Sequence, residues 1–298
     1  MAFAIVDVAK QLSNEAYVKK MRPGVISRLT NRLPEVQIGD TEFFDLSART
    51  KGEIVGEGAE KSPTPTTHPL RHVRTVKLQY TERFSDEFLT YSDEKQLKVV
   101  ETLAQKWMGS DFLRDLDTVV IHGINPLTGT VSTEIQDYLT KTGSSILVPS
   151  TGTTASAIDT DLADAIASVS DDGNVDGIAF SNAAATKLAG ITENGVVKYP
   201  SLGRFGLNVQ TFEGIGAASS KEVGEYGGTQ LVVGDFSALK WGVAAEMPVK
   251  LIEYGDPDGQ GDLQRHNQVA LRYEVVFGFG IANPYAFAVV KSEDESES

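Results

Sequence analysis

Residues 92–120 read SDEKQLKVVETLAQKWMGSDFLRDLDTVV, and this stretch decides the fold. Ser92 is a typical N-cap residue, and Asp93 and Glu94 stand in the first turn, where the helix dipole favours carboxylates. Apolar residues then recur at steps of three and four, which is the spacing of one helix face. The pattern predicts one continuous helix over residues 93–120, about 45 Å long at a rise of about 1.5 Å per residue. Its buried face is expected to hold Leu97, Val100, Ala104, Trp107, Met108, Leu113, Leu116 and Val120.

The sequence before this helix predicts a long excursion rather than a core. Residues 49–74 are rich in Gly, Pro and Thr and show no apolar periodicity. Residues 73–80 then alternate between apolar and polar side chains, as a strand does. A loop of this length is unusual inside a compact domain unless it serves as an interaction arm. We therefore predict a two-stranded arm over residues 49–80 that leaves the body of the protein.

The rest of the chain predicts an N-terminal helical arm and an α/β second half. Residues 5–21 have helical apolar spacing and end at Pro23-Gly24. A turn over residues 122–129 ends the long helix, and a Ser/Thr/Gly-rich linker over residues 140–156 predicts a domain junction near residue 150. Further helices are expected at residues 159–169 and 182–189, and strands at 175–180, 207–212, 230–234, 249–254, 269–281 and 286–290.

The net charge of −14 is distributed unevenly. Residues 1–34 carry six Lys and Arg against Asp7 and Glu15, whereas the rest of the chain is acidic, including the tail at residues 292–298. An acidic body argues against direct nucleic-acid binding, because phosphate contacts need clustered Lys and Arg. The lack of cysteine excludes disulfides, thiolate metal sites and cysteine nucleophiles. Since no run of about 18 apolar residues is present, we expect a soluble, cytoplasmic product without a membrane segment.

The sequence contains no strong motif for a conventional enzyme or a metal site. The four histidines are dispersed along the chain, which argues against a zinc site. The turn that begins at Asp256 is similar to a calcium loop, but its twelfth position, which requires a bidentate Glu, is Asn267. A plain hairpin turn is the favoured interpretation. Gly214-Ile215-Gly216 lacks the third glycine of a dinucleotide-binding loop. We therefore expect no conventional catalytic site, no cofactor and no metal.

The order of these parts resembles that of the Hong Kong 97-type capsid proteins of tailed bacteriophages. Residues 52–61 (GEIVGEGAEK) are similar to the extended loop of that family, the E-loop, and residues 84–92 (FSDEFLTYS) are similar to the entry into its spine helix. Further stretches that resemble family motifs are residues 123–129, residues 188–206, Gly234-Asp235-Phe236 and Asn283-Pro284-Tyr285-Ala286-Phe287. The order and spacing of these motifs over residues 25–291 carry the resemblance.

The resemblance implies an α+β fold of the Hong Kong 97 type. Its parts are an N-arm, an extended E-loop hairpin, a long spine helix with the sheet of a peripheral (P) domain, and an α/β axial (A) domain. The implied boundaries are 1–48 for the N-terminal arm and the start of the P-domain, 49–80 for the E-loop, 81–150 for the P-domain with the spine helix, 151–245 for the A-domain, 246–291 for late strands that complete both domains, and 292–298 for an acidic tail.

The implied function is structural. The chain would be a major capsid protein that assembles itself into the icosahedral shell around phage double-stranded DNA, in the cytoplasm of a host bacterium. Its partners would be copies of itself in pentamers and hexamers, with A-domains around five- and six-fold axes, P-domains at three-fold axes and each E-loop over a neighbour. DNA would be enclosed without sequence-specific binding, and separate scaffolding, portal and decoration proteins are candidate partners.

Two further expectations concern relatives of the same fold. Some members carry a scaffolding segment of about a hundred residues before the arm; none precedes it here, so we expect no cleaved scaffold domain. An encapsulin, a bacterial nanocompartment shell protein, is the alternative assignment. Encapsulins use an N-terminal helix to form a cargo pocket, and residues 1–34 resemble a phage arm more closely.

Two sets of site residues follow from the resemblance. Some members join an E-loop lysine to a P-domain asparagine of another subunit, assisted by a glutamate that accepts the proton of the amine. The matching residues are Lys61, Asn267 and Glu274, and this self-cross-linking would be the only chemistry of a protein that is otherwise not an enzyme. The second set comprises candidates for ion pairs with neighbouring subunits, with a solvated charged loop as the alternative: Lys51, Glu53, Glu57, Glu60 and Lys61.

Overall fold

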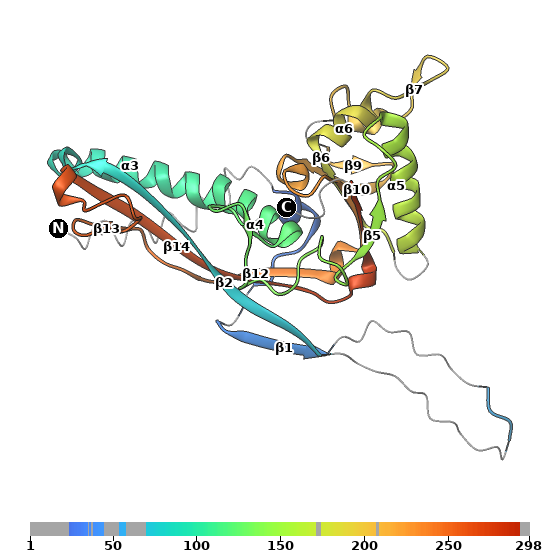
Figure 1. The fold of residues 1–298 in the computed structure, drawn as a ribbon, viewed down its shortest axis with the longest axis horizontal. Helices are drawn as coiled ribbons and strands as arrows, with labels where there is room; N and C mark the ends of the chain where they lie inside the picture. Colours follow the sequence, from blue (N-terminus) through green and yellow to red (C-terminus); the bar gives the residue numbers. More distant parts are fainter. Residues whose placement is uncertain are drawn as a thin grey trace.

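Two β-sheets joined by one long helix form the framework of the molecule (Figure 1). The computed structural model describes residues 24–34, 36, 38–44, 54–57, 70–170, 174–206 and 209–292. The helical arm predicted over residues 5–21 and the acidic tail beyond residue 292 lie outside this part of the chain. Within it, no helix is long and apolar enough to cross a membrane.

The predicted spine helix is present as one continuous run of helical turns. It consists of α3 (Asp93–Lys106), a π-helical turn (Trp107–Asp111) and α4 (Phe112–His122). The predicted apolar face is buried except for the half-buried Leu97, so this prediction is confirmed. The π-helical turn, which accommodates an extra residue in the helix, was not predicted. Gly123 ends the helix in a left-handed conformation (φ +66°) that favours glycine.

The first sheet is antiparallel and carries the spine helix on one face (Figure 1). Its strands lie in the order β1-β2-β14-β12, and β13 also pairs with β14. The rings of Tyr80, Trp107 and Tyr273 stack with centroids 6.2 to 6.5 Å apart and hold the helix against the sheet. The strands are β1 (Asp40–Phe44), β2 (Leu70–Ser85), β12 (Leu239–Glu246), β13 (Lys250–Ile252) and β14 (Gln268–Ile281).

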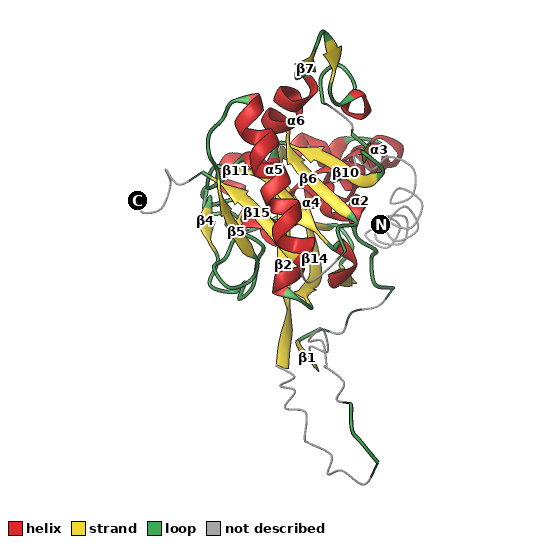
Figure 2. Ribbon diagram, turned by 90° about the vertical axis from the view of Figure 1, so that its right-hand side faces the viewer, coloured by secondary structure: helices red, strands yellow, loops and turns green. Residues whose placement is uncertain are grey.

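The second sheet is mixed and lies at the other end of the spine helix. Its strand order is β5-β15-β11-β6-β10-β9, with β5 parallel to β15 and β6 parallel to β10. Helices α5 (Ala155–Ser170) and α6 (Asn182–Ala189) pack on one face (Figure 2). The strands are β5 (Ile146–Pro149), β6 (Gly177–Ser181), β9 (Thr211–Phe212), β10 (Ile215–Ser220), β11 (Thr229–Gly234) and β15 (Phe287–Lys291).

Most predicted elements are confirmed, and the exceptions have simple causes. Helices α5 and α6 and strands β2, β6, β11, β13, β14 and β15 lie at the predicted places. The stretch over residues 140–156, predicted as a Ser/Thr/Gly-rich linker, contains strand β5, which pairs with β15. Strands β10 and β12 were not predicted; the sequence of β10, IGAASS, consists of small residues without clear alternation. Residues 207 and 208 of the predicted strand 207–212 lie outside the described residues.

Three short elements complete the framework. Helix α2 (Val25–Leu29) packs against α4 and β10, and hairpin β3–β4 (Ile124–Asn125 and Thr130–Val131) follows the spine helix. Hairpin β7–β8 (Thr192–Glu193 and Val196–Val197) follows α6. In Figure 2, β7 and the end of the β1–β2 ribbon project from opposite ends of the molecule.

Candidate assembly surfaces

Strand β2 continues past the sheet that supports it. From Thr75 to Ser85 it pairs with β14, whereas residues 70–74 pair only with β1 among the described strands. Figure 1 shows this β1–β2 ribbon leaving the body of the molecule. An isolated two-stranded ribbon is marginally stable in water, because it has no core to cover. The ribbon would therefore gain stability from a partner surface.

The structure describes only residues 54–57 between the two strands of the ribbon. Ile54 is fully exposed, Val55 is 38% exposed, and Glu57 is exposed. An exposed isoleucine at the end of an arm is a stronger candidate contact than a solvated charge. The sequence analysis predicted only charged contact residues in this loop and missed Ile54. The signal in the sequence is the apolar pair Ile54-Val55 within a polar stretch. The other predicted loop residues lie outside the described residues: Lys51, Glu53, Glu60 and Lys61.

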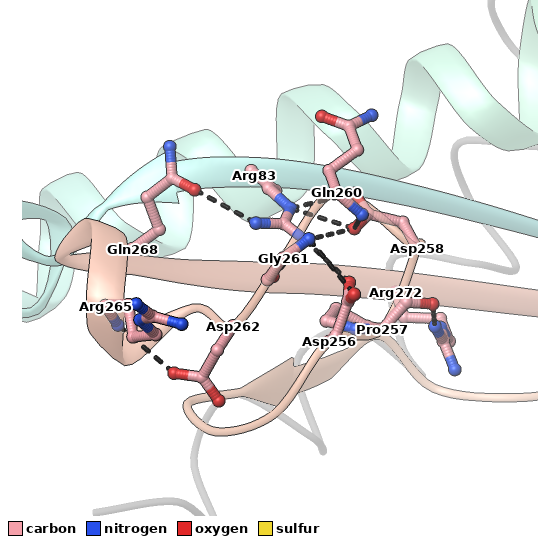
Figure 3. Close-up of polar contacts among 10 residues, drawn as sticks. All are labelled: Arg83, Asp256, Pro257, Asp258, Gln260, Gly261, Asp262, Arg265, Gln268 and Arg272. Carbon is pink, nitrogen blue, oxygen red and sulfur yellow. Dashed lines mark hydrogen bonds and ion pairs between the residues drawn. The ribbon is translucent and has the colours of Figure 1, made fainter.

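At the opposite end of β2, Arg83 holds the loop between β13 and β14 (Figure 3). Its Nε lies 3.0 and 2.9 Å from the two carboxylate oxygens of Asp258, and one Nη lies 3.0 Å from Asp256. The guanidinium also donates to the Gly261 carbonyl (2.8 Å) and the Gln268 side chain (3.2 Å). We call these five residues the Arg83 clasp. The Arg83 guanidinium holds the pKa of Asp258 below its ordinary value.

The clasp explains the acidic turn that is similar to a calcium loop. Asp256 and Asp258 bind a guanidinium, and Asn267 adopts a left-handed conformation (φ +51°) at the start of β14. In the described part of the chain, no group of three or more His, Asp or Glu is arranged to hold a metal ion. Near the clasp, Tyr254 is 66% exposed and forms a candidate contact at this end of the sheet.

A buried carboxylate ties the N-terminal side of the chain to the spine helix. Asp117 is fully buried and accepts hydrogen bonds from the backbone N–H groups of Val25 (2.8 Å) and Ile26 (2.9 Å), at the start of α2. Burial raises the pKa of Asp117 to about 7, and the nearby Glu222 adds to the effect. This contact fixes the start of α2 against the spine helix.

Polar contacts also join α4 to the end of β10 in the second sheet and to the turn that follows it. Arg114 donates to Glu222 at 2.5 Å, and Ser220 donates to the other carboxylate oxygen of Glu222. Burial acts to raise the pKa of Glu222, but these two donors outweigh it and hold the pKa below its ordinary value. His122 Nε2 lies 3.0 Å from the Glu222 carbonyl, and burial lowers the pKa of His122 to about 4. At neutral pH the imidazole is therefore uncharged and part of the structure.

The outer hairpin β7–β8 presents apolar side chains to solvent. Val196 is 67% exposed and Val197 is 43% exposed. The base of the hairpin is fixed by Lys198, which contacts Asp159 at 2.5 Å and Glu193 at 3.6 Å. A hairpin held at its base by ion pairs and carrying two exposed valines in β8 is suited to contact with another protein surface.

Of the proposed cross-linking residues, Asn267 and Glu274 lie apart within one chain. Asn267 is exposed just before β14, and Glu274 lies seven residues further along, about 23 Å away at strand spacing. Glu274 forms an ion pair with Lys77 at 3.2 Å. Lys61 lies outside the described residues. The cross-link stays a prediction, and it requires these residues to come from different copies.

Comparison with known proteins gives one consistent result. The model of the phage capsid family matches residues 6–292. A structure from Mycobacterium phage Ogopogo is 39% identical, with 92% of this chain and 94% of that chain covered and a TM-score of 0.75. One from Gordonia phage Cozz is 27% identical, with coverages of 93% and 89% and a TM-score of 0.70. A "Capsid of empty GTA particle" is 14% identical, with coverages of 92% and 93% and a TM-score of 0.60, and shows likeness of fold alone. None of the curated proteins matches the sequence.

Proposed function

Because this chain belongs to the phage capsid family, we propose that copies of it join into the icosahedral shell through three projecting parts: the β1–β2 ribbon, the clasped loop and the outer hairpin. The chain is a structural subunit of a phage head and has its place in the virion shell. The encapsulin alternative is not favoured, since the family match and the similar structures point to phages.

The observation that carries the proposal is the ribbon. A chain that extends a strand beyond the sheet formed by the other described strands, with Ile54 exposed between the two strands of the ribbon, presents a surface that another molecule can cover. Repeated heterologous contacts of this kind close into rings when the rotation between copies permits. Pentamers and hexamers are the rings from which an icosahedral shell would form.

The charge of the chain supports the role proposed for DNA. With a net charge of −14, the subunit repels phosphates and would enclose DNA without adhering to it. The other proposed partners are separate scaffolding, portal and decoration proteins, and the proposed place of assembly is the cytoplasm of the host bacterium. Each of these partner proteins would bind a surface that the shell leaves exposed.

Negative-stain microscopy of the purified protein tests the proposal. The full chain is expected to form closed shells of uniform size. Deletion of residues 56–69 is expected to leave folded subunits or capsomers, with an unchanged far-ultraviolet circular dichroism spectrum, that form no shells. Replacement of the same residues by a Gly/Ser linker of equal length is the matched control for the cost of closing the loop. Normal shells from the deletion variant would contradict the proposal for the ribbon.

A further inference from the structure

The outer hairpin β7–β8 turns at Asn194-Gly195, the only Asn-Gly step in the sequence. Glu193 pairs with Val196, so the loop between the two strands consists of these two residues alone. Both have left-handed backbones, with φ +51° for Asn194 and φ +82° for Gly195. Two positive φ angles in a two-residue loop identify a type I′ turn, for which Asn-Gly is a favoured sequence.

An asparagine that precedes glycine is open to loss of its side-chain amide, because glycine has no Cβ that would shield its backbone nitrogen. In this reaction the lone pair of the deprotonated Gly195 nitrogen forms a C–N bond to Cγ of Asn194. The bond from Cγ to the side-chain nitrogen breaks, and that nitrogen leaves as ammonia with the proton that Gly195 gave up. Water then opens the cyclic imide at either carbonyl, which gives aspartate or isoaspartate.

The type I′ turn opposes this reaction. Closure of a nearly planar five-membered ring requires Cβ of Asn194 and the nitrogen of Gly195 to be eclipsed about the Cα–C bond. The ψ of about +30° at the first central residue of a type I′ turn places the two atoms on nearly opposite sides of that bond. The reacting atoms are therefore far from an attack geometry. The amide is protected while the hairpin is formed and becomes reactive when the turn opens.

Little holds the turn closed in a single chain. Every residue from Thr192 to Val197 is exposed, and Figure 2 shows β7 projecting from one end of the molecule. A two-stranded hairpin without a core to cover is marginally stable in water, so its tip opens locally. The base is better fixed, because Lys198 donates its backbone N–H to Ile191 at 2.9 Å and contacts Asp159 at 2.5 Å.

We propose that Asn194 is a modification site, at which unassembled subunits lose the side-chain amide by ring closure onto Gly195, and that contact with a neighbouring copy in the shell protects it. The second part rests on the proposed function, because it requires the outer hairpin to lie between copies.

The product of the reaction is unsuited to the contact that the hairpin would make. Isoaspartate carries the main chain through its side chain and adds one carbon to the backbone, so a two-residue turn no longer joins the strands. A new carboxylate also lies beside Glu193. The exposed Val196 and Val197, whose positions depend on the strand register, lose their arrangement. The reaction thus removes the outer hairpin as a contact surface from subunits that remain unassembled.

Peptide mass spectrometry tests the proposal. Unassembled subunits, purified shells and urea-unfolded chain are incubated side by side in mildly alkaline buffer, and the peptide that contains Asn194 is followed over time. Chromatography separates its asparagine, aspartate and isoaspartate forms. The loss is expected to be fastest in the unfolded chain, slower in unassembled subunits, and slower again by about tenfold in shells. Asn267 in the unassembled subunits is the internal reference, since it is exposed and left-handed but precedes Gln268, and it should keep its amide.

Four results would overturn the proposal. Equal rates in unfolded chain and unassembled subunits would show that the turn gives no protection. Loss in the unfolded chain but not in unassembled subunits would show that the turn does not open. Equal rates in unassembled subunits and intact shells would show that no neighbour covers the hairpin. Equal loss at Asn194 and Asn267 would show that the Asn-Gly step has no special reactivity.

A looser hairpin base should speed the reaction. Lys198→Met removes the contacts with Asp159 and Glu193, and the loss of amide in unassembled subunits should become about threefold faster. Lys187→Met is the matched control, because it removes an exposed lysine of α6 that contacts the Thr153 carbonyl and not the hairpin. Equal rates for the two variants would contradict control of the reaction by hairpin opening.

Assembly of aged protein tests the consequence for the shell. Asn194→Gly has no amide to lose and keeps a sequence that fits a type I′ turn. After incubation as unassembled subunits, the wild type should form fewer shells, in proportion to its isoaspartate content, while Asn194→Gly should assemble as before. An equal decline of both would contradict the role of Asn194. If fresh wild-type protein forms no shells, the proposed function fails by itself, whereas the rates in unassembled subunits and unfolded chain still decide whether Asn194 is a modification site.

Discussion

The two halves of strand β2 belong to one continuous strand but have different surroundings. The inner half, from Thr75 to Ser85, lies on β14, and its Leu78 and Tyr80 pack against the core under the spine helix. The outer half, residues 70–74, pairs with β1 alone among the described strands and lies beyond the helix (Figure 1). The two parts of this strand are therefore expected to have different roles. We expect the inner half to govern folding of the subunit and the outer half to govern contacts between copies.

The same separation holds for the polar contacts of the molecule. Asp117 is fully buried and bridges α2 and α4, so its loss is expected to affect folding. The Arg83 clasp lies at the rim of the sheet, where Asp256 is 40% exposed, so its loss is expected to affect the shape of a surface loop. Substitutions in these places test the comparison, and their expected effects decrease from the core outward.

The largest effect is expected at Trp107, in the core under the inner half of β2. Its side chain is 2% exposed and stacks with Tyr80 and Tyr273. Trp107→Asp would bury an unpaired charge, at a cost of about 5 kcal/mol or more, comparable to the whole stability of a domain. The variant should be recovered as insoluble or unfolded protein, as judged by circular dichroism and size-exclusion chromatography. Trp107→Phe is the control and should still fold; soluble, assembling Trp107→Asp protein would contradict the core assignment.

A smaller loss of stability is expected at Asp117. Asp117→Ala leaves the N–H groups of Val25 and Ile26 buried without an acceptor, which should lower the free energy of unfolding by about 2 to 4 kcal/mol. Urea unfolding of unassembled protein measures this. Asp115→Ala is a comparison on the same helix, because Asp115 is only partly buried and accepts from the Tyr80 hydroxyl rather than from backbone groups. If the two variants lost equal stability, Asp117 would have no special role at the start of α2.

Asp117 should also give the stability a pH dependence of known sign. Its pKa is about 7 in the folded protein, above the ordinary value of about 4 for an unfolded aspartate. Its contribution is therefore fully present below about pH 4 and is lost as the pH rises towards about 7, by up to about 1.4 kcal/mol per pH unit. Asp117→Asn does not titrate. The free energy of unfolding of the wild type should thus fall relative to that of Asp117→Asn between about pH 4.5 and about pH 7.5; a constant difference would contradict the raised pKa.

Loss of the Arg83 clasp should change a surface loop and leave the fold intact. Arg83→Met removes the donor shared by Asp256 and Asp258, so the loop should be cleaved faster by proteases while the melting temperature falls by no more than about 3 °C. Arg265→Met is the control in the same loop, because Arg265 binds Asp262 through its backbone N–H and not its guanidinium. Equal protease sensitivity of the two variants would indicate that the clasp does not order the loop.

The elements that the sequence predicted well are those with a strong local pattern. The spine helix follows from the spacing of residues such as Val100, Ala104 and Trp107, and β14 follows from its long apolar run. The contacts that sequence reasoning missed join residues far apart in the chain. Asp117 lies 92 positions from Val25, and Arg83 lies 175 from Asp258, and no local periodicity marks such pairs. In the sequence, Asp117 is typical of a helix surface and Asp258 is typical of a turn. Their hydrogen-bond partners are seen only in the three-dimensional structure.

Strands β5 and β10 were missed for a related reason. β5 lies in a Ser/Thr/Gly-rich region, and β10 is made of small residues, so neither has the alternation that marks a strand. Both are strands because neighbouring strands supply their hydrogen bonds: β5 pairs with β15, and β10 pairs with β6. The family resemblance anticipated the order of the parts, whereas the surface residues that carry contacts depend on pairings that only the three-dimensional structure reveals.

The smallest expected effect on the fold, and the sharpest test of contact between copies, concerns the isopeptide bond proposed for Lys61 and Asn267. In this reaction the neutral lysine Nζ attacks the side-chain carbonyl carbon of the asparagine, a C–N bond forms, and ammonia leaves with a proton that a carboxylate has relayed from the amine. Asn267 is exposed and accessible to another chain, and Glu274 would have to exchange its contact with Lys77 for that role. Because Asn267 and Glu274 lie about 23 Å apart within one chain at strand spacing, the reaction requires at least two copies and cannot occur in free subunits.

Boiled mature shells should therefore give a ladder of dimers and larger species on denaturing electrophoresis, and Lys61→Ala should abolish the ladder without changing shell formation or melting temperature. Lys77→Ala is the matched control, since it removes a lysine beside Glu274 and should leave the ladder intact. A single band near the 32.1 kDa monomer from assembled wild-type shells would end the proposal.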